Sequence, residues 1–300
     1  MIVALVLGLA VTAAIPTEVV VKRPDCQLAG ELLTPTGRAP KTLVVILAGS
    51  GPTDRDGNSK AGLRTNLYQD IAHALGERGL AVLRYDKRGV GKSTAPDRPP
   101  LFSDFVEDAR AFVDELAPRY RRVVVVGHSE GGLLALHLGK HPAVKRLVLL
   151  AATGRPLQAV LREQLATEGD AAVLGSYDRL VGKLLAGEPL ESVPRTLEPI
   201  FAPAVQPFLR SVLAIDPVSL VKDLDLPIVV LQGRTDVQVK PLDAELLGNA
   251  RAGVEVVLLD EANHLFRHEP KYTRRQRSYV DPTLPFAPGF LAALTKAIGK

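Results

Sequence analysis

The sequence contains few residues of several types, and each shortage excludes a class of protein. Cys26 is the only cysteine among 300 residues, so no disulfide can form within the chain. Tryptophan is absent, and aromatic residues make up only 5% of the chain. The net charge is a modest +4, and the lysines and arginines are scattered along the sequence. Few aromatics and no basic cluster argue against a nucleic-acid-binding protein.

The sequence also lacks an apolar run long enough for a stable membrane span. Residues 1–15 carry no charged side chain and end at Pro16, but a span needs about 20 residues. Such a stretch, with small residues for cleavage at 11–14, is typical of a signal peptide, although no lysine or arginine precedes it. We therefore predict a signal peptide at 1–15 and a secreted or periplasmic protein. The alternative, a buried first strand or a misassigned start codon, would leave the protein cytoplasmic.

Apolar runs and helical segments alternate along most of the chain. With 46% hydrophobic residues, the chain can bury a large core. Two β-rich segments, 17–22 and 28–33, precede the predicted central strands at 43–47, 80–85, 123–126, 145–151, 227–233 and 254–259. Predicted helices lie at 67–78, at 102–116 with Ser103 as its cap, at 133–138 and at 290–298. This alternation predicts an α/β fold with a mostly parallel central sheet flanked by helices.

The alternation stops between residues 155 and 225. Leucine, alanine, glutamate and proline dominate this segment, helical stretches such as 157–168 occur, and no strand-like run is found. We therefore predict an α-helical cap at 155–225, inserted into a core domain that consists of 16–154 and 226–300.

The clearest local pattern is a strand that runs into the motif G-x-S-x-G. Four consecutive valines at 123–126 favour extended backbone, buried on both faces of a sheet. Gly127 and Gly131 flank Ser129 where backbone segments must nearly touch, and a helix is predicted directly afterwards. The amino terminus of that helix would favour negative charge beside the serine. This context makes Ser129 a candidate nucleophile.

A nucleophilic serine needs a base to take its proton and an acid to orient that base. Asp236 follows the predicted strand at 227–233, and His264 follows the one at 254–259. The order serine, acid, histidine, each beyond the carboxyl end of a strand, is a known order for such a triad. Asp260 and Glu261 are competing acids because they lie close to His264 in the sequence.

Patterns for bound phosphate or metal are incomplete. A phosphate loop of the type G-x-x-x-x-G-K-S would need glycine where Asp86 stands. His137 with His141, and His264 with His268, have a spacing that can bind zinc on a helix. No glutamate follows the first histidine of either pair, and no cysteine supports them. We therefore expect neither a metal nor a cofactor.

Two further motifs follow predicted strands, G-S-G-P-T-D-R-D-G-N at Gly49–Asn58 and Y-D-x-R-G-x-G-x-S at Tyr85–Ser93. With them the sequence resembles the α/β-hydrolase superfamily, and within it a bacterial group of serine esterase-like hydrolases. The resemblance covers nearly the whole chain beyond the first 27 residues. It implies Ser129 as the nucleophile, Asp236 as the acid and His264 as the base.

The resemblance also implies an oxyanion hole made of backbone N–H groups. One donor would be the N–H of Glu130, directly after the nucleophile, and the other that of Ser50 or Gly51. Losing one such donor commonly costs about 10² to 10³ in rate. Ala48 stands where many relatives carry histidine, which does not remove a backbone donor.

Charged residues in the two loops are candidates for bracing them. An ion pair within Asp54-Arg55-Asp56 would hold the first loop, and one between Arg88 and Asp86 would hold the second. Ordinary solvated charges are the alternative in both loops.

The expected function is hydrolysis of carboxylic esters with short to medium acyl chains, through an acyl-enzyme. The partner would be a small-molecule acyl substrate, and the sequence does not indicate an oligomeric state. The cap should line the acyl pocket with residues such as Phe201, Phe208 and Leu213.

Three alternatives remain open at this point. An aminopeptidase or a thioesterase would use the same triad, and an aminopeptidase would need acidic cap residues to hold a free amine. Glu188, Glu191 and Glu198 are the candidates for that role. A non-catalytic protein with the same fold, which binds a ligand or a partner, is the third alternative, because one fold hosts many functions.

Overall fold

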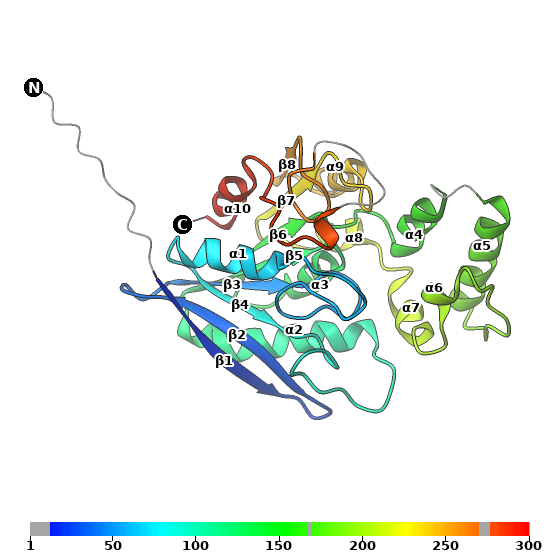
Figure 1. Ribbon diagram of the computed structural model, residues 1–300, viewed down its shortest axis with the longest axis horizontal. Helices are drawn as coiled ribbons and strands as arrows, with labels where there is room; N and C mark the ends of the chain where they lie inside the picture. The colour runs from blue at the N-terminus through cyan, green and yellow to red at the C-terminus, as the bar shows by residue number, and fades with distance from the viewer. Residues whose placement is uncertain (1–12, 167–169, 270–276, 300) are drawn as a thin grey trace, which may run out of the picture.

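The computed structural model describes residues 13–166, 170–269 and 277–299 (Figure 1). The predicted signal peptide lies almost wholly outside the described residues and stays a prediction. Its last residues, Ala14 and Ile15, are described and belong to the first strand. Within the described ranges, no helix has the length and apolar character needed to cross a membrane.

The core of the molecule is one eight-stranded sheet. Its strands are Ala14–Lys22 (β1), Gln27–Pro35 (β2), Thr42–Leu47 (β3), Ala81–Tyr85 (β4), Arg122–His128 (β5), Val144–Leu150 (β6), Ile228–Gly233 (β7) and Val254–Leu259 (β8). The spatial order is β1-β2-β4-β3-β5-β6-β7-β8. Only the pairs β1 with β2 and β2 with β4 are antiparallel among these strands. The predicted mostly parallel α/β sheet is confirmed.

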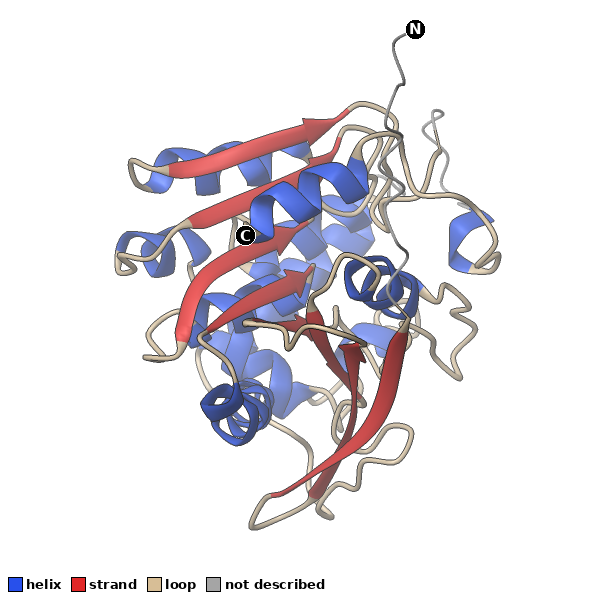
Figure 2. Cartoon of the chain, turned by 90° about the vertical axis from the view of Figure 1, so that its left-hand side faces the viewer, coloured by secondary structure: helices blue, strands red, loops and turns tan. Residues whose placement is uncertain are grey.

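Helices cover both faces of this sheet (Figure 2). They are Leu67–Gly76 (α1) and Phe290–Ile298 (α10) on one face, and Phe102–Leu116 (α2), Glu130–Leu138 (α3) and Pro241–Ala250 (α9) on the other. Successive valines of β5 point to opposite faces: Val124 and Val126 pack with α1 and α10, whereas Val123 and Val125 pack with α2 and α3. This double burial explains why β5 is an uninterrupted apolar run.

Two details of the helices differ from the sequence prediction. The cap of α2 is not Ser103: the carboxylate of Asp104 accepts the N–H of Leu101 at 2.7 Å, which satisfies the start of the helix. Helix α9 was not predicted, although Pro241 at its first turn is a recognised start signal. Because α9 is only partly buried, its apolar residues form only a weak helical pattern in the sequence.

The segment between β6 and β7 contains helices and no strand in its described part. The helices are Leu157–Ala166 (α4), Ala171–Leu185 (α5), Glu198–Phe201 (α6), Gln206–Val212 (α7) and Pro217–Lys222 (α8). Figure 1 shows α4 to α7 grouped to one side of the sheet. They share a small core of their own around Tyr177, Leu184 and Phe201, whereas α8 packs against α3 and α9. The division into core and cap domains at residues 155 and 225 stays a prediction.

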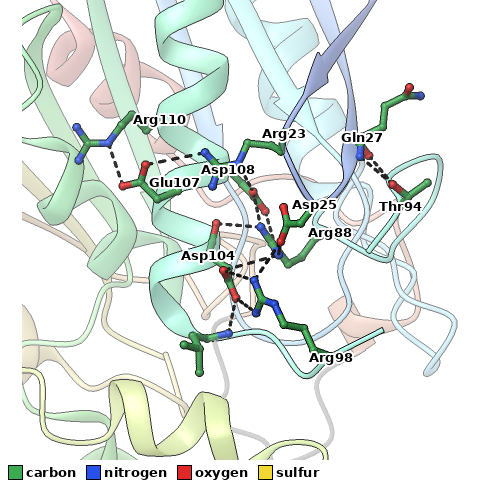
Figure 3. A network of polar contacts seen from close by, with 11 residues as sticks. Arg23, Asp25, Gln27, Arg88, Thr94, Arg98, Asp104, Glu107, Asp108 and Arg110 are labelled. Carbon is green, nitrogen blue, oxygen red and sulfur yellow. Dashed lines mark hydrogen bonds and ion pairs between the residues drawn. The ribbon is translucent and has the colours of Figure 1, made fainter. Parts of the chain in front are cut away.

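A network of arginines and carboxylates holds the β1–β2 hairpin against the loop after β4 and against α2 (Figure 3). Arg88 contacts Asp108 at two points, Nε–Oδ2 at 2.8 Å and Nη2–Oδ1 at 2.7 Å, and both side chains are buried. Asp25, in the hairpin turn, contacts both Arg88 and Arg98. The predicted pairing of Arg88 with Asp86 is therefore wrong, because the buried face of α2 brings Asp108 directly opposite the guanidinium.

Candidate active site

Ser129 stands on a strained turn between β5 and α3. Its backbone has φ 53° and ψ −121°, a conformation that a residue with a side chain rarely adopts. The flanking glycines make the turn possible: a Cβ on Gly127 would lie 2.2 Å from the carbonyl oxygen of Gly131. A Cβ on Gly131 would lie 2.3 Å from the carbonyl oxygen of Leu47. The motif therefore presents the serine at the carboxyl edge of the sheet, as predicted.

Asp236 and His264, which follow β7 and β8, are brought together at the same edge. His264 Nδ1 lies 2.8 Å from Asp236 Oδ2, and both residues are buried. The other carboxylate oxygen accepts the N–H groups of Gln238 at 2.8 Å and of Val239 at 3.0 Å. Since the carboxylate oxygen can only accept, Nδ1 of a neutral His264 carries the proton and Nε2 is left as a base.

The competing acids are engaged elsewhere. Asp260 is exposed and pairs with Arg234 at 2.9 Å, and Glu261 lies 3.4 Å from His268. The structure thus brings His264 to Asp236, the acid that chain order favoured.

The loop that carries His264 is held by residues that the sequence did not single out. The side-chain oxygen of Asn263 accepts the N–H groups of Leu265 and Arg267 at 2.9 and 3.0 Å. Its amide nitrogen donates to Ser278 Oγ at 2.7 Å and also contacts Glu269. The only sequence signal was the position of Asn263 directly before the candidate base.

The loop after β3 has N–H groups that remain free for a ligand. The N–H of Gly49 donates to the hydroxyl of Tyr68 at 2.7 Å, so this donor is already used. In the described part of the chain, the N–H groups of Ser50, Gly51 and Glu130 have no protein acceptor. These three were the predicted oxyanion donors. Ser50, Gly51 and Glu130 also line the same cavity as Ser129.

A chain of hydrogen bonds joins this loop to the loop of His264. Tyr68, whose hydroxyl accepts from Gly49, lies 2.9 Å from His128 Nδ1, and His128 Nε2 lies 2.9 Å from the carbonyl oxygen of His264. A carbonyl can only accept, so His128 Nε2 carries the proton and Nδ1 accepts from Tyr68. His128 is therefore neutral and fixed in one tautomer between the two loops.

Burial of His128, together with the nearby His264, lowers its pKa from 6.5 to about 3. The unfolded chain binds a proton on this ring below about pH 6.5, whereas the folded chain does not until about pH 3. We therefore expect the free energy of unfolding to fall as the pH drops below about 6.5, by up to about 1.4 kcal/mol per pH unit from this group. Urea unfolding of the wild type and of His128→Gln, between about pH 7 and pH 5, checks this.

The wild type should lose more stability over this range than His128→Gln, whatever the difference between them at neutral pH. His137, whose pKa is also lowered by burial, titrates in both proteins and cancels in the comparison. Equal pH slopes in the two proteins would contradict the expectation.

The cavity beside Ser129 has a volume of about 510 Å³ and a mainly apolar wall. Small-molecule sites commonly have about 300–1,000 Å³. The helical segment contributes Leu157, Val160, Leu161, Ile200, Val205 and Phe208 to the wall. The prediction that cap residues line the pocket holds for Phe208, whereas Phe201 and Leu213 lie in the segment's own core and do not reach the cavity.

The two loops beside the cavity are tied together by Arg55 and Asp86. The guanidinium lies 2.7 Å from Asp86 Oδ2, and the N–H of Arg55 donates to Oδ1 at 2.9 Å. Although burial alone would raise the pKa of Asp86, the hydrogen bonds from Arg55 help to hold it below its usual value. The predicted ion pair within residues 54–56 is wrong: Arg55 pairs with Asp86 and with Glu18 of β1, and Asp54 instead accepts the N–H of Asp56.

The start of the helical segment is fastened to α9. Asp243 is fully buried and accepts the N–H groups of Gly154 and Arg155 at 3.0 and 3.2 Å. The guanidinium of Arg155 lies 2.7 Å from Asp243 Oδ2. These contacts fix where the wall of the cavity begins, and sequence analysis missed them because α9 itself was not predicted.

Comparison with known proteins agrees with this architecture. The family described as "Serine aminopeptidase, S33" matches residues 61–198. Esterase EstD of Thermotoga maritima is 29% identical over 79% of this chain and 58% of its own length. A monoacylglycerol lipase of Mycolicibacterium smegmatis is 31% identical over 42% of this chain and 43% of its own. The chain thus spans about half the length of these relatives.

Solved structures of similar fold include two esterases. One from Pyrococcus furiosus has a TM-score of 0.57 at 19% identity, covering 85% of this chain and 84% of that one. Another from Exiguobacterium antarcticum has a TM-score of 0.56 at 19% identity, covering 83% and 92%. At this identity the similarity concerns the fold. The strand order and these structural similarities show that the chain has the α/β-hydrolase fold.

Proposed function

We propose that the protein is a serine hydrolase, specifically a carboxylesterase acting on esters with short to medium acyl chains. The observation that carries the proposal is the buried hydrogen bond of 2.8 Å between His264 and Asp236, at the sheet edge where Ser129 opens into an apolar cavity. A base oriented in this way can activate a serine that would otherwise be a weak nucleophile.

In the proposed mechanism, Ser129 Oγ forms a bond to the carbonyl carbon of the ester while His264 Nε2 takes its proton. The negative oxygen is stabilised by the N–H of Glu130 and by that of Ser50 or Gly51. The intermediate collapses and expels the alcohol, which receives the proton from His264. Water, activated by His264, then attacks the acyl-enzyme and releases the carboxylic acid, and Ser129 regains its proton.

The cavity favours an acyl group over a free amine. Glu188, Glu191 and Glu198, the acidic residues that an aminopeptidase would need, are all exposed and outside the cavity wall. Of the described residues, Glu130 is the single carboxylate that lines the cavity, and Lys87 lies 3.2 Å from it. An ammonium group would therefore find no unpaired carboxylate among the described residues of the cavity wall. The esterase names of the similar proteins support the same choice.

We also place the chain in the bacterial esterase-like group within the superfamily. The support is the pair of motifs Gly49–Asn58 and Tyr85–Ser93, which form the two loops beside the cavity. Arg55 and Asp86, one from each motif, are the residues that tie these loops together.

Acyl-chain preference tests the proposed function. We expect p-nitrophenyl esters of butanoate to octanoate to be cleaved best, and Ile200→Trp to shift the preference towards acetate, because the indole would fill the wall of the cavity. Leu185→Trp is the matched control, since Leu185 is exposed on α5 away from the cavity. The measurement is kcat/KM along the ester series for all three proteins.

Aminoacyl anilides and acyl thioesters belong in the same assay. If the anilides were cleaved faster than any ester, the protein would be an aminopeptidase and not an esterase. If the thioesters were cleaved faster than any ester, it would be a thioesterase. An unchanged chain-length preference in Ile200→Trp would refute the proposal that the acyl chain binds in this cavity.

A further inference from the structure

The peptide unit between Gly49 and Ser50 is held by a buried lysine. Lys87, in the loop after β4, donates from Nζ to the carbonyl oxygen of Gly49. The same ammonium lies 3.2 Å from Glu130 Oε1, on the residue directly after Ser129. Lys87 thus bridges the loop after β3 and the first turn of α3.

Because a peptide unit is planar, the contact between Lys87 and the Gly49 carbonyl also affects the direction of the Ser50 N–H. In a trans peptide the carbonyl of Gly49 and the N–H of Ser50 point in opposite directions. A lysine that fixes the carbonyl therefore also fixes the direction of the Ser50 N–H. Because Gly49 has no side chain, its backbone torsions offer little resistance to rotation of this unit, and an external contact is needed to hold it.

The loop lies close enough to the nucleophile for this orientation to matter. A Cβ on Gly49 would lie 3.3 Å from the Cβ of Ser129 and 3.3 Å from His128 Nδ1. Ser50 lines the cavity together with Ser129, and its N–H has no protein acceptor in the described ranges. It is therefore a donor held ready beside the reacting serine.

The cost of burying the ion pair indicates a specific role. The side chains of Lys87 and Glu130 are only 5% and 8% exposed, and the ammonium also lies 5.4 Å from the centre of the Phe105 ring. Two apolar side chains of similar volume would often stabilise such a position equally well or better. A cation on the carbonyl oxygen, however, polarises the peptide and strengthens its N–H as a donor.

We propose that Lys87, anchored by the carboxylate of Glu130, is a positioning residue that orients and polarises the Ser50 N–H as the second oxyanion donor. The proposal rests on the proposed esterase function. It also assigns a role to the Glu130 side chain, whose backbone N–H is the first donor. One residue then serves the oxyanion hole directly through its backbone and indirectly through its side chain.

The test compares Lys87→Met with the wild type on the best ester. We expect kcat to fall about 10²-fold, as for the loss of one oxyanion donor, with KM changed by less than about 2-fold. The affinity for a trifluoromethyl ketone of matching chain length, which forms a tetrahedral adduct with a nucleophilic serine, should fall by the same factor as kcat. Lys87→Arg, which keeps the charge and a donor, should recover most of the loss.

Lys92→Met is the matched control, because Lys92 lies in the same loop with a side chain that is 71% exposed. It should behave as the wild type. If Lys87→Met does not fold, the double variant Lys87→Met/Glu130→Gln removes both charges together and takes its place. A kcat/KM within about 2-fold of the wild type, or a lower kcat with unchanged ketone affinity, would overturn the proposal.

Failure of the proposed function would look different. In that case the wild type itself would neither hydrolyse the esters nor react with a fluorophosphonate probe. The role proposed for Lys87 would then be refuted together with the esterase function. An active wild type with an equally active Lys87→Met variant would overturn only the role of Lys87.

Discussion

Replacement of Ser129 by alanine is expected to reduce ester hydrolysis by about 10⁴- to 10⁶-fold, to a level near the background. The expected effect is large because, in the proposed mechanism, the hydroxyl oxygen of Ser129 forms the bond to the acyl group. The strained backbone at Ser129 is held by the glycine contacts around it, and alanine keeps the same Cβ, so the fold should be unchanged. The measurement is kcat/KM on the best ester, with circular dichroism as the check on folding.

Ser176→Ala is a suitable control because Ser176 lies on α5, outside the wall of the cavity. It should keep the activity of the wild type. A fluorophosphonate probe should label the wild type and the control but not Ser129→Ala. Full hydrolysis by Ser129→Ala would refute the proposed nucleophile, and a wild type that neither labels nor hydrolyses would favour a non-catalytic binding protein.

Asp236→Asn is expected to lower kcat by about 10²- to 10⁴-fold while preserving the fold. The N–H groups of Gln238 and Val239 donate to Oδ1, so the oxygen of the new amide would stay at that position. Its nitrogen would then face His264 Nδ1, where a donor meets a donor. His264 must move its proton to Nε2 to accept from the amide, and in that tautomer it cannot take the proton of Ser129.

Asp260→Asn is the matched control, because Asp260 is close to His264 in sequence but exposed and paired with Arg234. It should retain full activity on the same ester. If Asp260→Asn were impaired and Asp236→Asn were not, the assignment of the acid would be reversed.

The sheet could be predicted, and the three candidate catalytic residues could be proposed, because local sequence patterns point to them. The valine run of β5 and the glycines around Ser129 each satisfy a steric demand within a few residues. Asp236 and His264 were found because parallel strands place their carboxyl ends at one edge, so chain order alone brings these residues to the site.

The contacts that support the site could not be predicted, since they join residues far apart in the chain. From the sequence, Tyr68 would be an ordinary core residue of α1. In the structure, its hydroxyl connects Gly49 to His128. Lys87 occupies the variable position of a motif, where nothing local distinguishes it from a surface lysine. Its partner Glu130 becomes apparent only when β3, β4 and β5 are placed side by side.

The two ion-pair predictions were wrong for the same reason. Both predictions paired charged residues that are close in the sequence. In the structure, Arg55, Asp86 and Arg88 each pair with a residue of a neighbouring loop or helix. Such pairings depend on the distance between elements, which hydrophobic periodicity does not encode. Likewise, Phe201 and Phe208 are only seven positions apart, and only the packing of α6 and α7 decides which one reaches the cavity.

The strand order is compatible with assembly of the sheet in two stages during synthesis. The first five of the eight strands, which end with His128, form one continuous part of the sheet. The partners of Arg55 and Arg88 all lie between Glu18 and Asp108. As the chain emerges from the ribosome, this part of the sheet and its ion pairs can form before β7 and β8 have been synthesised. In that order of assembly the proposed nucleophile Ser129 is placed first, and Asp236 and His264 join it only when the last third of the chain has been made.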